Sequence, residues 1–136
     1  MMAGRMRLSG WALAVAGIIM VITAGLHGMG YRPLVLQLSS STLAEAWLDG
    51  VKGLWLVFSL HLVIVGALFL MAALKPGAVG KGVLIVAGLL PAGDTVVLLS
   101  SVGVFIGSIC LGLVAVLVYL GVALRPDAAA SDGSGK

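Results

Sequence analysis

An uninterrupted apolar stretch at residues 54–74, LWLVFSLHLVIVGALFLMAAL, constrains the fold more than any other part of the sequence. A helix of ~20 residues, rising ~1.5 Å per residue, crosses the hydrocarbon core of a bilayer, so this stretch can span a membrane. Its one ionisable side chain is that of His61. In helical projection, His61 shares one half of the surface with Ser59 and Gly66, whereas the opposite half is aliphatic. Because lipid is apolar, the half with the polar and small side chains should face protein.

The composition extends this conclusion to the whole chain. Its 136 residues are 61% hydrophobic and 10% charged, with a mean hydropathy of +1.22, whereas a water-soluble domain has a polar exterior and is nearer half apolar. The net charge of +3 does not indicate nucleic acid binding, because the basic residues flank apolar stretches, where they orient a membrane protein. A single cysteine, Cys110, excludes an intrachain disulfide and a CxxC redox pair, and we interpret it as a small buried hydrophobic residue.

Three further apolar stretches predict three more spans. The four predicted spans cover residues 8–29, 54–74, 82–100 and 103–124. The first begins like a secretory signal peptide, but its apolar region exceeds the ~7–15 residues of a signal h-region, so we expect it to be retained. Short links at residues 75–81 and 100–103 make spans two, three and four antiparallel neighbours. We therefore predict a single all-α domain over residues 1–126, an integral membrane four-helix bundle, followed by a disordered tail at residues 127–136.

The connection between the first two spans, residues 30–53, is the longest. The tripeptide YRP at residues 31–33 is expected to break the first helix. Thr42 and Glu45 have the spacing of a capping box, which predicts a helix that starts there. Residues 42–49 are then either a short interfacial helix between spans one and two or the projecting start of span two.

The lysines and arginines predict the orientation. With the N-terminus inside, six basic residues lie in the cytoplasm and two lie outside, and this asymmetry is consistent at every turn. The cytoplasmic set is Arg5, Arg7, Lys75, Lys81, Arg125 and Lys136, and the external set is Arg32 and Lys52. We therefore predict a multi-pass protein of a bacterial inner membrane with both termini in the cytoplasm.

Small residues at helical spacing predict where helices approach closely. They recur in a 4-3-4-3-4 pattern along span one, and span four begins with a GxxxG pair. The predicted packing positions are Gly10, Ala14, Gly17, Ala24, Gly66, Gly103 and Gly107. Trp47 and Trp55 suit the aromatic belt at headgroup level, and we interpret them as interface anchors.

A polar cluster is predicted in the outer leaflet. The helix rise places His61 ~10 Å and Asp94 ~9 Å below the outer edge of their spans, so the two residues lie at nearly one level. Ser59 shares the projected face of His61, and Thr95 shares that of Asp94. His27 lies near the same edge, where we expect headgroups and water to solvate it.

Asp94 follows a proline within its span. Pro91 has no N–H to donate to the carbonyl of Ala87, so the helix is locally polar and open to kinking one turn before the carboxyl group. A carboxylate at membrane depth costs several kcal/mol unless it is paired. Asp94 and His61 therefore either form a functional pair or make structural hydrogen bonds that hold spans two and three in register.

These features leave three classes of function. The first is a non-catalytic accessory or assembly protein, because the sequence has small-residue seams, no assignable catalytic residue, and no nucleotide-binding loop, HExxH, GxSxG or CxxC motif. The second is a small-solute or proton-coupled transporter that uses His61 and Asp94. The third is a haem protein with His27 and His61 as ligands, although their depths differ by ~10 Å. We otherwise assign no cofactor and no metal. The expected partners are the lipid bilayer and a homo-oligomer or larger membrane complex, not nucleic acid.

The order of features resembles a known family. The chain has an N-terminal span that ends in GLHG at residues 25–28, an outer loop with YRP at residues 31–33, and a Trp-rich start of span two. This plan is similar to that of the small four-helix bacterial membrane proteins of the DoxX-like family and related uncharacterised families, over most of residues 8–125. DoxX-like proteins are linked to quinone or thiol oxidation, so the resemblance implies a redox-associated membrane subunit. It assigns no role to an individual residue, and the chain has one cysteine.

Overall fold

The computed structural model describes residues 2–125, in which all regular secondary structure is helical. The five helices are α1 (Met2–Met29), α2 (Tyr31–Ser39), α3 (Glu45–Leu74), α4 (Lys81–Ser101) and α5 (Ile106–Leu124). Four candidate spans are long and apolar enough to cross a membrane, and the first of them runs through α1 and α2. The predictions of an all-helical fold and of four helical stretches long and apolar enough to span a membrane are therefore confirmed. The tail predicted at residues 127–136 lies outside the described residues.

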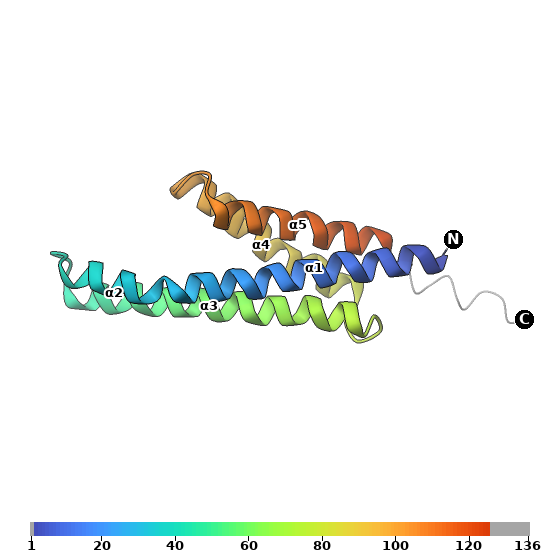
Figure 1. The fold of residues 1–136 in the computed structure, drawn as a ribbon, viewed down its shortest axis with the longest axis horizontal. Helices are drawn as coiled ribbons and strands as arrows, with labels where there is room; N and C mark the ends of the chain where they lie inside the picture. The colour runs from blue at the N-terminus through green and yellow to red at the C-terminus, as the bar shows by residue number, and fades with distance from the viewer. Residues whose placement is uncertain (1, 126–136) are drawn as a thin grey trace, which may run out of the picture.

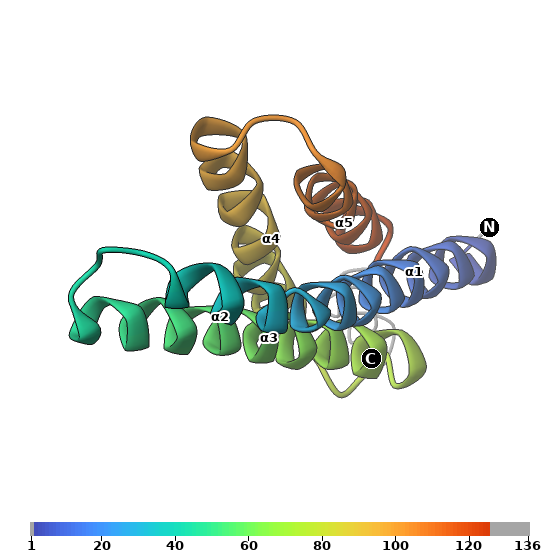
Figure 2. The same cartoon turned by 60° about the vertical axis from the view of Figure 1, so that its left-hand side comes forward.

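The order of the helices in space differs from their order in the chain. Helix α1 packs along α3 on one side and against α5 on the other, and α4 packs on α5 (Figure 1). Helix α4 leaves the turn after α3 at a steep angle, so the two helices diverge (Figure 2). The short links had predicted that spans two, three and four are successive neighbours. This is correct for spans three and four, since α4 packs on α5, but not for spans two and three, since α3 and α4 diverge. A short link fixes the ends of two helices close together but does not fix which faces pack.

Glycines allow the close helix crossings. A Cβ atom added to Gly17 of α1 would lie 2.8 Å from the carbonyl oxygen of Gly66 in α3, and one on Gly66 would lie 3.1 Å from that of Gly17. Gly88 of α4 lies against the side chains of Val118 and Tyr119 in α5. Because these positions carry no side chain, the backbones approach each other closely, as is usual where membrane helices pack.

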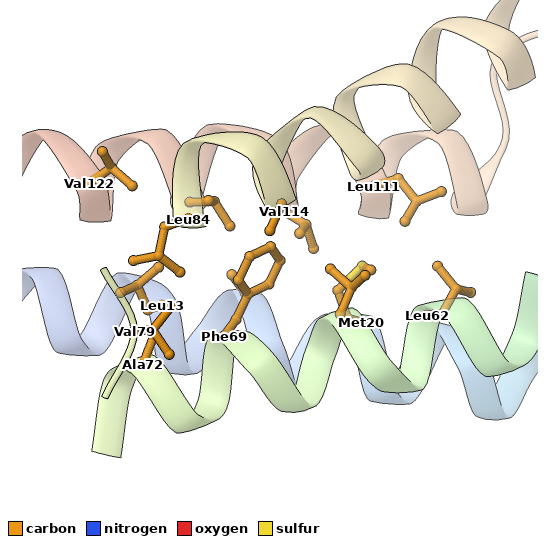
Figure 3. Packing of buried hydrophobic residues seen from close by; sticks show 14 of the residues in the cluster. Leu13, Met20, Leu62, Phe69, Ala72, Val79, Leu84, Leu111, Val114 and Val122 are labelled. Carbon is orange, nitrogen blue, oxygen red and sulfur yellow. The ribbon is translucent and has the colours of Figure 1, made fainter. Parts of the chain in front are cut away.

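The buried core lies between α1, α3, α5 and the first half of α4. Phe69 projects from α3 toward Leu84 of α4 and Val114 of α5, and all three side chains are fully buried (Figure 3). Leu13 and Met20 of α1 extend the same cluster and are equally inaccessible. Lipid is as apolar as these side chains, so in a membrane their contribution comes from close packing and not from removal of water.

The connection between α1 and α3 corrects the sequence prediction. The segment YRP starts helix α2 and does not end a helix, because Pro33 falls in the first turn, where backbone N–H groups lack intrahelical partners anyway. Helix α3 begins at Glu45 with Ala44 as its N-cap and no side-chain capping bond, so Thr42 forms no capping box. Residues 45–53 are the start of α3, which agrees with the second predicted alternative, and the first candidate span continues from α1 into α2. Figure 1 shows this region extending beyond α4 and α5.

The prediction that Gly103 and Gly107 are helix-packing positions is also wrong, since neither lies at a contact between helices. Gly103 belongs to the link after α4, has a φ of +92°, and donates its N–H to the carbonyl of Leu98 at 3.0 Å. Gly107 faces the ring of Phe105 in its own turn. Helix α5 begins three residues later than predicted, so Gly103 lies in the link before α5 and Gly107 in its first turn. Gly88 and Gly121 occupy the helix contacts instead.

Candidate functional site

The structure brings together His61 of α3 and Asp94 of α4. His61 lies thirteen residues before the end of α3 and Asp94 thirteen residues after the start of α4, so the helix rise places both ~20 Å from the connecting turn. The imidazole Nε2 is 3.6 Å from the carboxyl Oδ2. This distance allows an ion pair but is too long for a hydrogen bond.

The two facing atoms are sealed from solvent. Nε2 of His61 and Oδ2 of Asp94 are both inaccessible, and neither has a hydrogen-bond partner within residues 2–125. The rest of each side chain is partly exposed, at 23% for His61 and 21% for Asp94. Buried polar atoms are normally hydrogen-bonded, and exceptions call for an explanation. The pair is therefore poised to gain a partner or to share a proton.

On α4, the site lies just beyond a proline. Pro91 is buried within the helix, and Asp94 follows it by three residues. Thr95, predicted as a member of the polar cluster, donates its hydroxyl to the carbonyl of Pro91 at 2.7 Å. It thus stabilises the turn after the proline and does not hydrogen-bond the pair.

On α3, aromatic rings support the imidazole. Phe58 meets the ring of His61 edge-on, with centroids 5.5 Å apart, and lies 4.9 Å from the ring of His27. Phe58 therefore contacts both histidines, and a haem held between the two imidazoles would have to displace it. Phe58 shares the projected helix half of His61, so the helical pattern could have identified this contact.

His27 is not simply solvated, which corrects the sequence expectation. Its Nδ1 lies 2.9 Å from the hydroxyl of Ser59, which itself donates to the carbonyl of Trp55 at 3.1 Å. Ser59 therefore pairs with His27 and not with His61.

Trp55 completes this second cluster. Its ring stacks on that of His27 with centroids 4.0 Å apart, and its indole N–H donates to the carbonyl of His27 at 2.8 Å. The polar atom of Trp55 is thus used within the protein, whereas the side chain of Trp47 is exposed. Two clusters result: His61 with Asp94 and His27 with Ser59 and Trp55, joined through Phe58.

In the described chain, no group of three or more His, Cys, Asp or Glu residues could hold a metal ion.

At the opposite end of the bundle, Arg125 fastens three elements together. Its guanidinium donates to the carbonyl of Ala72 in the last turn of α3 at 2.7 Å and to that of Val79 in the following turn at 2.6 Å. Burial lowers the pKa of Arg125, but guanidinium stays protonated in proteins. A cation at a helix C-terminus also interacts favourably with the helix dipole. The sequence indicated Arg125 only as an orienting charge.

The comparisons with known proteins found no matching family model, no similar curated protein and no similar solved structure. The resemblance to the DoxX-like family therefore stays a prediction.

Proposed function

We propose that this chain is a proton-coupled membrane protein of the small-transporter class, in which His61 and Asp94 form the proton-binding site. The observation that carries the proposal is the 3.6 Å approach of two shielded, titratable atoms that have no other hydrogen-bond partner. Ionisable groups at membrane depth mark proton and ion pathways more often than they serve packing. Contacts that serve packing alone are usually satisfied, as in the His27 and Ser59 cluster.

The chemistry of the pair suits proton exchange. An imidazole and a carboxyl group can share one proton at zero net charge, either as two neutral groups or as an ion pair. Uptake of a further proton gives the pair one positive charge, which is costly at membrane depth, and so drives a change in its surroundings. Among the side chains of proteins in their unperturbed state, the imidazole of histidine is the one that changes charge nearest to neutral pH.

The predicted orientation supports a site that faces outward. The six-to-two asymmetry of lysines and arginines favours cytoplasmic termini of a multi-pass protein in a bacterial inner membrane. The turn after α3 is then cytoplasmic, and a pair ~20 Å from it lies in the outer half of a hydrocarbon core ~30 Å thick.

Proton flux into liposomes tests the proposal. Purified protein is reconstituted around a pH-sensitive dye, a potential is imposed with potassium and valinomycin, and the internal pH is followed. Asp94→Asn and His61→Gln are expected to reduce the flux at least tenfold, because each removes a titratable group while preserving shape. Asp49→Asn makes the same chemical change at a carboxylate paired with Lys52 on the exposed start of α3, and should leave the flux unchanged.

Flux that persists in Asp94→Asn would overturn the proposal. Absence of flux in the unaltered protein would also overturn it, and would favour the non-catalytic accessory role. In that case, replacing His61 and Asp94 together with apolar residues should leave cellular function intact and change only stability.

A further inference from the structure

Helix α4 has two halves with different support. The buried residues of α4 are Leu84, Ala87, Gly88 and Pro91, and all of them belong to its first half, residues 81–91. The second half, residues 92–101, contains no buried residue, and we call it the distal half of α4. Its closest supports are Leu98, which packs partly against the core, and Thr95, which lies near Gly112 of α5. The distal half is therefore the less firmly held part of the helix.

The boundary between the two halves is built as a hinge. Pro91 cannot donate to the carbonyl of Ala87, so one backbone hydrogen bond of the helix is missing at that point. Beyond the other end of the distal half, Gly103 adopts a φ of +92°, a conformation that glycine reaches without strain. The segment thus has a weak point in the helix on one side and a glycine turn on the other.

The pair joins the distal half to α3. Helices α3 and α4 diverge after their turn (Figure 2) and otherwise contact each other little, so the approach of Asp94 to His61 bridges the opening between them. At the turn itself, the guanidinium of Arg125 holds the end of α3 and the turn together. Movement of α4 against α3 is therefore restricted at the turn and least restricted at the distal half.

We propose that the distal half of α4 is a gate that pivots at Pro91 away from α3 when Asp94 is protonated, and that this movement opens the His61–Asp94 pair to the outer side. The proposal rests on the proposed function, because it makes proton binding the trigger. It explains how two atoms that are sealed in the structure become open to the outer side once a proton has reached Asp94, whose side chain is partly exposed. Protonation removes the negative charge of Asp94, so an imidazolium on His61 loses its counter-charge and gains by reaching water.

The other titratable groups near the site are engaged elsewhere, so the trigger of the gate is protonation of the His61–Asp94 pair. From α1, His27 approaches the site through Phe58 and is bonded to Ser59. From α5, the hydroxyl of Tyr119 donates to the carbonyl of Ile85 in the first half of α4, away from the gate. Cys110, the one thiol of the chain, is half-buried on α5. In the described chain, the charged group that acts on Asp94 is His61.

The distance between spin labels tests the gate. Cys110 is first replaced by alanine, and labels are attached at exposed positions 60 of α3 and 97 of α4, which report on the distal half. A matched pair of labels at positions 71 and 83, which are also exposed, reports on the end of the bundle where Arg125 holds α3 and the following turn together. The distal half is ten residues long, or ~15 Å, so a change of ~20° in the kink at Pro91 moves its end by ~5 Å.

Position 97 lies six residues, or ~9 Å, beyond Pro91, so acidification of the protein in liposomes is expected to lengthen the 60–97 distance by ~3 Å and to leave the 71–83 distance unchanged. His61→Gln should remove this response, because no imidazolium can form, and Asp49→Asn should behave like the unaltered protein. Exchange of the two groups, His61→Asp with Asp94→His, should restore the pH dependence, because it rebuilds the pair in reverse.

A 60–97 distance that does not respond to pH overturns the gate, as does the same response in His61→Gln or an equal movement of the 71–83 pair. The liposome flux of the same variants separates the two proposals. Flux with a fixed distance refutes the gate and supports the proton-binding function, whereas pH-driven movement without flux supports the gate and refutes transport.

Discussion

Replacing Gly17 with alanine is expected to destabilise the pairing of α1 with α3. The new Cβ atom would lie 2.7 Å from Cγ of Leu70 and 2.8 Å from the carbonyl oxygen of Gly66. Leu70 can change its rotamer, but the carbonyl belongs to the backbone of α3 and can move only if the helices separate. The clash therefore acts on the closest crossing of the two helices.

The magnitude follows from a comparison with a second glycine of the same helix. Alanine at Gly25 meets nothing within 4 Å, so Gly25→Ala keeps only the gain in helix propensity, about 0.5–1 kcal/mol. Gly17→Ala has the same gain and adds the overpacking cost of ~1–3 kcal/mol. The difference between the two variants should thus be ~1–3 kcal/mol, or roughly 5- to 150-fold in the unfolding equilibrium at 1.4 kcal/mol per factor of ten.

The assay is equilibrium unfolding in mixed micelles of a mild detergent and dodecyl sulfate, followed by circular dichroism. Gly66→Ala should resemble Gly17→Ala, because its Cβ would lie 3.1 Å from the carbonyl of Gly17 and 3.0 Å from Cβ of Met20. Equal stability of Gly17→Ala and Gly25→Ala would refute the close approach of α1 and α3 at this crossing.

Two further variants probe other contacts in the same unfolding assay. Arg125→Lys should cost ~1–3 kcal/mol, because a single ammonium group cannot reproduce the fork that reaches two backbone carbonyls, whereas Arg32→Lys at an exposed position should cost less than ~0.5 kcal/mol. If Arg125→Lys were as stable as the unaltered protein, the role of Arg125 in holding α3 and the following turn together would be contradicted. Ser59→Ala should cost ~1–2 kcal/mol by leaving Nδ1 of His27 without its hydrogen-bond partner, whereas Ser100→Ala, at an exposed hydroxyl, should change the stability little. Equal costs for the two serine variants would argue against the cluster.

The four spans were predictable from the sequence because hydropathy and length decide them locally. The shared level of His61 and Asp94 was also within reach, since each residue is counted along a helix of known rise from a common turn. The sequence also indicated Gly17 and Gly66 as small residues suited to close packing, which is where the structure places them.

The remaining features depend on relations that a single sequence does not carry. Which helix packs on α4 is decided by faces and angles, and the short links constrain only their ends. The contact of His27 with Ser59 depends on the axial register of α1 against α3. Gly103 and Gly107 were assigned to a helix contact in error because α5 starts three residues later than predicted, which leaves Gly103 in the link and Gly107 in the first turn of the helix.

The central place of α1 has a consequence for biosynthesis. Membrane helices form individually before they associate, so in the predicted membrane protein α1 is synthesised before α3 and α5, both of which it contacts. An α1–α3 hairpin could assemble as soon as α3 is inserted, whereas α4 would enter the bilayer before α5, its main packing partner, has been synthesised. During that interval Asp94 would lie in a helix without its final neighbours, until α5 packs on α4.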